Sequence, residues 1–281
     1  MPKIAIITDS TAFMPDALVK KYNVNVIPVA IHWDGETLFD GVDITPEAFY
    51  ERLATSKTLP STSQPSAGDF LKLFEKLSKD HDGIIAPLIS TGVSGTINSA
   101  EVALQTFDKV PVEIIDTHSV SGGLGMVVEQ AALALAEGKG LTEARQVAED
   151  VAQKSKVFFV VDTLKYLHAG GRIGGASRFF GSALDIKPIL YLNEVGKIDG
   201  LEKVRTKKKA VTRIIELAVE YAAGRPVDAC VMHANVADEA EDLKKRLADG
   251  LDCGDIEVYG ISAGVGVHVG PGALGLAVYP H

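Results

Sequence analysis

A glycine- and hydroxyl-rich turn at residues 90–96 is the segment of this chain best suited to bind a ligand. It follows the apolar run 84–88, which predicts a buried strand, and the apolar spacing from about Ser94 onward predicts a helix. Glycines let a ligand approach the backbone closely, and free N–H groups at a helix N-terminus attract anions. Hydroxyl groups add hydrogen-bond donors without adding charge. The turn therefore indicates a site for a carboxylate or a phosphate.

A second hydroxyl-rich loop, residues 62–66, precedes another predicted helix. Ser66 is placed to cap that helix, with Asp69 at the position where a capping box carries Glu or Gln. A cap accounts for Ser66 but gives no structural reason for the polar side chains of Thr62, Ser63 and Gln64. Taken together with the first turn, this loop is a second candidate for ligand binding.

His268 stands in an apolar, glycine-rich segment, residues 264–275. A single histidine in such surroundings is usually a core or hinge residue, but the glycines on both sides, Gly270 among them, favour contact with a ligand. Neutral imidazole can donate one hydrogen bond to a carboxylate, and imidazolium also neutralises its charge. The glycines also match a dinucleotide-binding fingerprint. We reject that match because the fingerprint must open a helix, whereas the residues that follow predict a strand.

Five cations lie within residues 203–209, in a chain of net charge −9. Most charge runs of this kind are solvated surface. Cations at the start of a helix oppose its macrodipole, however, and Arg172 lies in a glycine loop of the same half of the chain. A docking or phosphate-facing patch containing Arg172 and Arg205 is therefore the alternative interpretation.

Asp9 and Asp116 each follow a predicted strand, at the edge where open α/β sheets bind ligands. Both are also placed to cap the next element, and we prefer that interpretation. The sequence predicts no metal site, because its histidines lack ligand spacing and no Cys-x-x-Cys pair occurs. Cys230 and Cys253 are expected to be free thiols in a reducing compartment.

The length of 281 residues favours two domains, and 46% apolar residues with a mean hydropathy of +0.15 suit a well-packed α/β protein. The net charge argues against nonspecific binding to nucleic acid or to an anionic membrane, so at most transient membrane contact is expected. The apolar run near the N-terminus is too short for a signal peptide, and no apolar stretch is long enough to span a membrane. These features predict a soluble, cytoplasmic protein.

Strand-like and helical segments alternate through the first 160 residues. The predicted strands are residues 3–8, 24–33, 84–88 and 112–115, and the predicted helices are residues 15–22, 45–53, 66–77, 94–107 and 124–136. This alternation predicts an N-terminal α/β domain, residues 1–160, with a mainly parallel sheet flanked by helices.

The pattern changes after residue 160. Short strands at 189–192 and 196–204 predict a hairpin around residues 193–195. The other predicted elements are a helix at 206–222, a strand at 229–232, a helix at 238–247 and strands at 256–259 and 276–279. We therefore expect a C-terminal α+β domain, residues 161–281, packed closely on the first.

Taken together, the segments above resemble the DegV family of bacterial fatty-acid-binding proteins, the acyl-carrying subunits of fatty acid kinase. The resemblance rests on seven segments in the family's order, residues 8–12, 62–66, 90–96, 116–117, 167–173, 203–210 and 268–272. No single segment is decisive, but the ordered set is highly specific and spans nearly the whole chain.

The resemblance implies that one long-chain fatty acid lies in a tunnel between the two domains. It assigns the hydrogen bonds to the fatty-acid carboxylate to three side chains, Thr62, Ser94 and His268. By the same resemblance, the neighbouring ligand loops contribute Ser63, Gly95, Thr96 and Gly270. The residues that face a kinase partner or an acyl phosphate are Arg172 and Arg205. The implied partner is an ATP-dependent fatty acid kinase subunit, so this chain would need no cofactor and would not itself be an enzyme.

Two alternatives stay open on the sequence. A serine hydrolase would use Ser94 as nucleophile, His268 as base and Asp9 to orient it, although the sequence around Ser94 lacks the elbow pattern of α/β-hydrolases. A regulatory protein that binds a phosphorylated sugar would use the same turns but needs a polar pocket. The chain also departs from the family at Ile97, where relatives often carry tyrosine, and this change affects either the tunnel lining or the packing of the helix.

Overall fold

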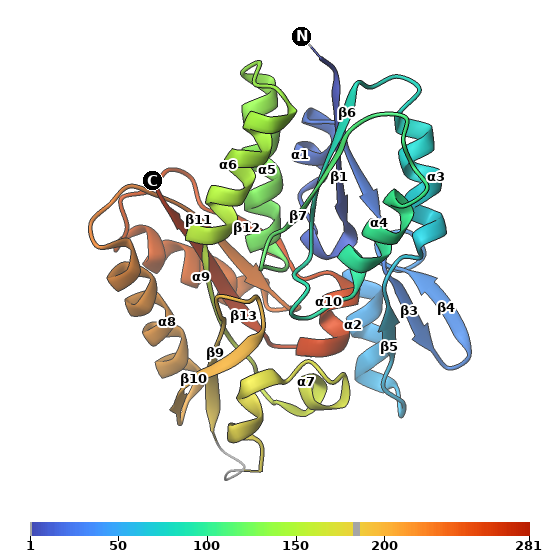
Figure 1. Cartoon of the computed structure of the whole chain (residues 1–281). Coiled ribbons are helices and arrows are strands. Elements are labelled where there is room, and N and C mark those ends of the chain that lie inside the picture. Colours follow the sequence, from blue (N-terminus) through green and yellow to red (C-terminus); the bar gives the residue numbers. More distant parts are fainter. Residues whose placement is uncertain (1, 182–185) are drawn as a thin grey trace.

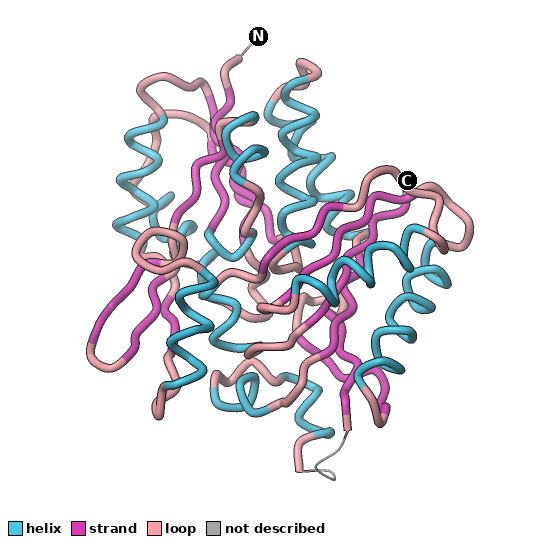
Figure 2. Tube along the Cα trace, turned by 180° about the vertical axis from the view of Figure 1, so that it is seen from behind, coloured by secondary structure: helices cyan, strands magenta, loops and turns pink. Residues whose placement is uncertain are grey.

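The computed structural model describes residues 2–181 and 186–281. Figure 1 shows two main sheets, each with helices packed on it, and a small third sheet below the first. Seen from behind, the strands of the two main sheets run in clearly different directions (Figure 2). The mixed α/β architecture, a parallel sheet flanked by helices with a second α+β part, confirms the predicted fold class.

The first sheet is wholly parallel, in the order β2-β1-β6-β7. Its strands are β1 (Ile4–Asp9), β2 (Val24–Ile27), β6 (Gly83–Leu88) and β7 (Val112–Asp116), and its helices are α1 (Asp16–Lys21), α3 (Ala67–Leu77), α4 (Thr96–Leu104), α5 (Gly122–Ala136) and α6 (Leu141–Lys154). Phe74 and Ala100 of α3 and α4 pack on one face, and Val128 and Ala148 of α5 and α6 pack on the other. Because the strands are parallel, the loops after β1, β6 and β7 meet at one edge of the sheet.

The second sheet has the order β10-β9-β8-β13-β11-β12 and is antiparallel except for the pair β11–β12. Its strands are β8 (Lys156–Val160), β9 (Lys187–Leu192), β10 (Ile198–Val204), β11 (Val227–His233), β12 (Glu257–Gly260) and β13 (Leu274–Pro280). Helices α8 (Lys207–Ala222) and α9 (Ala237–Ala248) cover one face through Ile214 and Leu243. The pairing of β9 with β10 confirms the predicted hairpin. Strand β8 of this sheet begins before residue 160, and the division into two domains stays a prediction.

A small antiparallel sheet, β4-β3-β5, connects the two halves. It consists of β3 (Ala30–Trp33), β4 (Glu36–Phe39) and β5 (Ser61–Ser63), accompanied by α2 (Pro46–Thr55), α7 (Lys165–Ala169) and α10 (Ala263–Val269). Helix α10 comes late in the chain but contacts β3, β5 and α2, which come early. Helix α5 likewise contacts β1 and β6 of the first sheet and β11 and β13 of the second. These two helices bind the halves into a shared core.

The structure adds detail that the sequence did not predict in three places. Residues 24–33 form two strands, β2 and β3, in different sheets. The segment that carries His268 is the short helix α10, which Ser262 caps by accepting a hydrogen bond from the Val265 N–H. Its glycines are needed for close packing, because a Cβ atom at Gly266 would lie 2.7 Å from the Tyr50 hydroxyl oxygen. Helix α6 was not predicted, because its apolar stripe consists mainly of alanines.

Candidate functional site

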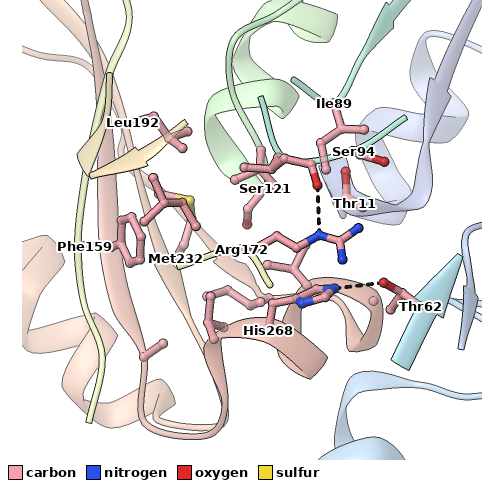
Figure 3. Close-up of a pocket in the computed structure, with 18 of the residues that line it drawn as sticks. Thr11, Thr62, Ile89, Ser94, Ser121, Phe159, Arg172, Leu192, Met232 and His268 are labelled. Atoms are coloured by element: carbon pink, nitrogen blue, oxygen red, sulfur yellow. Dashed lines mark hydrogen bonds between the residues drawn. The ribbon is translucent and has the colours of Figure 1, made fainter. Parts of the chain in front are cut away.

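A partly open cleft lies between the two halves and encloses about 930 Å³, its mouth included. Figure 3 shows side chains from both halves pointing into it, with polar groups gathered at one end. That end lies at the surface, because Ser63 and Gln64, which line it, are exposed. We call it the mouth and the remainder the interior.

The interior is apolar. Val157 and Phe159 of β8, Leu192 of β9, Ile198 of β10 and Met232 of β11 form much of its wall. Successive strand residues point to opposite faces, so Val157 and Phe159 share the face that looks into the cleft while Phe158 packs in the opposite core. A long apolar group is the ligand portion that fits such a wall.

Thr62 and His268 meet at the mouth although 206 positions separate them in the chain. The Thr62 Oγ1 atom lies 2.8 Å from His268 Nε2, across the contact between β5 and α10 (Figure 3). Burial, and secondly the charge of Arg172, lower the pKa of His268 to about 4. The imidazole is therefore neutral at pH 7 and acts as a single hydrogen-bond donor.

Gly170 gives the His268 ring its space. A Cβ atom at this position would lie 2.1 Å from His268 Nδ1. In the described part of the chain, that buried nitrogen has no hydrogen-bond partner. The glycine loop 170–175 was singled out for Arg172, so the contribution of Gly170 was missed.

Ser94 lines the cleft near the mouth. Its Oγ lies 2.9 Å from the Thr96 hydroxyl oxygen and accepts a hydrogen bond from the Thr96 N–H. Thr96 is itself fully buried, so its hydrogen bonds hold the Ser94 side chain in place. The helix predicted to begin near Ser94 starts at Thr96, with Gly95 as its N-cap.

Gly95 and Gly270 serve packing in this structure. The Gln64 side chain lies over Gly95 and donates hydrogen bonds to the Gly95 carbonyl at 2.9 Å and to Ser99 at 3.0 Å. Gly270 has φ +72°, and a Cβ atom there would lie 2.2 Å from the ring of Tyr166. Ser63 lines the mouth, and its hydroxyl lies 2.8 Å from His32 Nε2.

The structure separates the two arginines. Arg172 lines the cleft, where its Nε donates to the Val93 carbonyl at 3.1 Å and its Nη1 to the Gly170 carbonyl at 2.8 Å. Arg205 is exposed on the connection between β10 and α8. Within the basic run, Lys207 forms ion pairs with Asp162 and Glu239. Of these two arginines, only Arg172 lines the cleft.

Asp9 caps the short helical turn 10–12, as predicted, whereas Asp116 does not cap the next helix, because the N-cap of α5 is Ser121. Asp9 accepts hydrogen bonds from the Thr11 N–H at 3.1 Å and the Ile89 N–H at 2.8 Å. Asp116 accepts from the His118 N–H and from the Thr91 hydroxyl, which stands in the turn before Ser94. Both carboxylates therefore shape the edge of the sheet that carries the cleft.

The arrangement does not support the serine hydrolase alternative. Ser94 is bonded to Thr96, His268 to Thr62, and Asp9 to backbone and Thr11, and no hydrogen bond joins these three side chains to one another within the described residues. Ile97 packs with Phe70 and Ala100 in the core behind the first sheet, so its effect is on helix packing.

Residues 2–181 and 186–281 contain no group of three or more His, Cys, Asp or Glu side chains able to hold a metal ion. In the same described residues, no helix is both long and apolar enough to cross a membrane.

Comparison with known proteins gives one consistent result. The family described as "Uncharacterised protein, DegV family" matches residues 3–281. A DegV domain-containing protein of Clostridium perfringens is 38% identical over 279 residues, which cover 98% of each chain. A fatty-acid-binding DegV family protein from Thermus thermophilus superposes with a TM-score of 0.94 at 33% identity, covering 99% of this chain and 100% of that one. The fatty acid binding protein DegV from Bacillus subtilis gives a TM-score of 0.92 at 33% identity, with both chains fully covered.

Proposed function

This chain belongs to the DegV family, and we propose that it binds one long-chain fatty acid in the cleft, with the carboxylate at the mouth and the acyl chain in the interior. The observation that carries the proposal is the combination of an apolar interior with a mouth where Thr62 and His268 are hydrogen-bonded beside Ser94 and Arg172. The fatty-acid-binding relatives from Thermus thermophilus and Bacillus subtilis support it.

The energetics suit an acyl chain. Burial gains about 0.8 kcal/mol per CH₂ group, or roughly 10 kcal/mol for a C16 tail before the entropy of association is subtracted. A buried carboxylate is costly unless it is hydrogen-bonded and its charge is matched. Thr62, Ser94 and neutral His268 can donate hydrogen bonds, each worth about 1.5–3 kcal/mol to a charged acceptor. The matching positive charge comes from Arg172.

Our proposal extends to a partner. We infer that the bound fatty acid is presented at the exposed mouth to an ATP-dependent fatty acid kinase subunit, which converts the carboxylate to an acyl phosphate. In this scheme the chain is a carrier and performs no phosphoryl transfer itself. Arg172 would face the new phosphate, and the exposed Arg205 would contact the kinase.

The phosphosugar alternative fits less well. A sugar phosphate needs polar partners around its ring, whereas the wall beyond the mouth consists largely of apolar side chains such as Phe159, Leu192 and Met232.

Native mass spectrometry of the purified protein, followed by lipid analysis of what denaturation releases, tests the binding proposal. We expect one fatty acid per chain. If no lipid is found and added palmitate and oleate also fail to bind, the proposal is wrong. The partner step is tested by incubating the loaded protein with ATP and a bacterial fatty acid kinase subunit. Acyl phosphate should form, and Arg205→Ala should slow its formation while leaving fatty acid binding unchanged.

A further inference from the structure

Ser121 is a buried serine in the wall of the cleft that the family resemblance does not assign. It directly precedes α5 and has φ 55° and ψ −136°, a backbone conformation that residues other than glycine rarely adopt. Its side-chain hydroxyl is buried and has no hydrogen-bond partner among the described residues. Figure 3 shows Ser121 between Met232 and Leu192 on one side and Ser94 on the other. The interior thus holds a hydroxyl group that the protein leaves unpaired.

Tight packing around the start of α5 fixes this position. A Cβ atom at Gly122 would lie 2.5 Å from the Cys230 sulfur, and one at Gly123 would lie 2.7 Å from Val157 Cγ2. The Gly122 N–H also donates to the Met232 sulfur at 3.2 Å. The first turn of α5 is therefore pressed against the second sheet. A strained backbone of this kind persists only where its surroundings determine it, so the Ser121 hydroxyl is held in place in the wall.

The unpaired hydroxyl has a consequence for the ligand. A saturated acyl chain that fills the cleft would cover the Ser121 hydroxyl with methylene groups, which accept no hydrogen bond. A buried donor without a partner is costly, and the cost disappears when the ligand supplies an acceptor. A hydroxyl or keto oxygen on the acyl chain, at the depth of Ser121, would supply it.

We propose that Ser121 forms a subsite for an oxygen on the acyl chain, so that the protein accepts hydroxy or keto fatty acids in preference to the unsubstituted chain of the same length. This proposal rests on the proposed function. Ser121 acts here as a hydrogen-bonding group and not as a nucleophile. A nucleophilic serine needs a base bonded to its hydroxyl, and no such partner exists among the described residues.

The test compares stearate with a series of hydroxystearates whose hydroxyl group moves along the chain. Affinities are measured by isothermal titration on delipidated wild-type protein and on Ser121→Ala. We expect at least one positional isomer to bind wild type about three- to tenfold more tightly than stearate, the range of one net hydrogen bond. Ser121→Ala should bring that ratio to about one while leaving stearate affinity equal or higher.

Ser119→Ala is the matched control. Ser119 is also buried with an unpaired hydroxyl in the described part of the chain, two positions earlier, but lies outside the lining of the cleft. It should keep the wild-type ratio. Ser121→Gly removes the hydroxyl and also relieves the backbone, so it tests the same point if Ser121→Ala folds poorly.

The subsite is overturned if stearate binds wild type at least as well as every isomer, or if the ratio is unchanged in both Ser121 variants. Covalent labelling of Ser121 by a fluorophosphonate would also overturn it, in favour of a nucleophile. Failure of the proposed function is distinguishable, because stearate itself would then not bind.

Discussion

The mouth and the interior of the cleft are built in different ways. Much of the interior wall comes from strands of one sheet, where alternate residues such as Val157 and Phe159 face the same space. The mouth comes from elements far apart in the chain, with Thr62 on β5 and His268 on α10 joined by a single 2.8 Å contact. The interior therefore depends on a shared apolar character, whereas the mouth depends on particular pairs of atoms.

This difference implies different tolerance to change. Apolar residues of similar size can replace one another in the wall at a modest cost. At the mouth, a substitution that moves one ring by about an ångström breaks the contact, because hydrogen bonds weaken steeply with distance and angle. Four predictions on ligand binding and one on stability test the comparison.

The largest effect is expected from a charge in the interior. Leu192→Asp places a carboxylate in the wall, where water hydrates it while the cleft is empty. A bound acyl chain would strip that water, and burying an unpaired charge is very costly. We expect fatty acid affinity to fall by at least about a hundredfold, measured by titration with palmitate.

Leu201→Asp is the control for this prediction. Leu201 is 37% exposed on β10 and lies outside the lining of the cleft, whereas Leu192 is 5% exposed. The control should bind as wild type does. Since Leu192→Asp can also destabilise the fold, its melting temperature is measured without ligand. A folded Leu192→Asp protein with normal affinity would show that the acyl chain does not enter the interior.

His268→Leu removes a hydrogen-bond donor from the mouth and keeps most of the side-chain volume. Loss of one hydrogen bond to a carboxylate should weaken palmitate binding about ten- to a hundredfold. Methyl palmitate lacks the charge, so its affinity should change by less than about threefold. His81→Leu, in a histidine bonded to the Leu77 carbonyl away from the cleft, should change neither affinity. Equal losses of affinity for palmitate and for methyl palmitate would mean that His268 does not hydrogen-bond to the carboxylate.

Gly170→Ala should disturb the mouth without removing any polar group. The added methyl would lie 2.1 Å from His268 Nδ1, so the ring must shift and its contact with Thr62 must weaken. We expect palmitate affinity to fall about tenfold, near the lower limit for losing that bond. Gly68→Ala is the matched change in a helix, where the new methyl meets only Ser66 Oγ at 3.7 Å. Wild-type binding by Gly170→Ala would show that the ring position is not critical.

The same contrast explains what sequence alone predicts. Strand and helix periodicity depends on local spacing, so the parallel sheet, the β9–β10 hairpin and most helices were predictable. The candidate residues Thr62, Ser94 and His268 were found because hydroxyl groups and a histidine flanked by glycines are suited to contact a ligand. The resemblance to a family added their assignment to a carboxylate, which stays a proposal.

Tertiary contacts were not predictable in this way. No local pattern shows that Gly170 lies against His268, or that Gly266 lets α10 approach Tyr50. Ser121 offered a weak signal, a small residue before two glycines at the start of a helix, but its strained backbone follows from packing against the second sheet. Residues of this kind act through neighbours that are distant in the chain.

The smallest effect is expected from pH between 8 and 6. The pKa of His268 is about 4, so the ring is already neutral throughout this range, and the ligand carboxylate is ionised. Palmitate affinity should therefore change less than about twofold. A bound carboxylate raises the pKa of His268, so any gain in affinity belongs below pH 6. A rise of tenfold between pH 8 and 6 would show instead that binding requires the imidazolium form.

The dependence of folding stability on pH below 6.5 tests the pKa of His268 independently of ligand binding. Two titrating groups matter here, His268 near the end of α10 and Asp40 beside its first turn. A histidine whose pKa is lowered from 6.5 to about 4 binds its proton later in the folded protein, so its contribution to stability falls as pH falls through that window. Asp40 contacts the first turn of α10 near Gly264, and burial raises its pKa to about 6. As pH falls, Asp40 binds its proton at a higher pH in the folded protein than in the unfolded chain. The contribution of Asp40 to the free energy of unfolding therefore rises as pH falls from 6 toward 4.

The two contributions oppose each other. Relative to wild type, Asp40→Asn should therefore lose unfolding free energy on acidification from pH 6.5 to 4.5, and His268→Leu should gain it, each by about 1–2 kcal/mol in urea denaturation. If both variants followed the wild-type pH profile, neither group would titrate as its burial requires. The conclusion that His268 is neutral at the mouth would then be wrong.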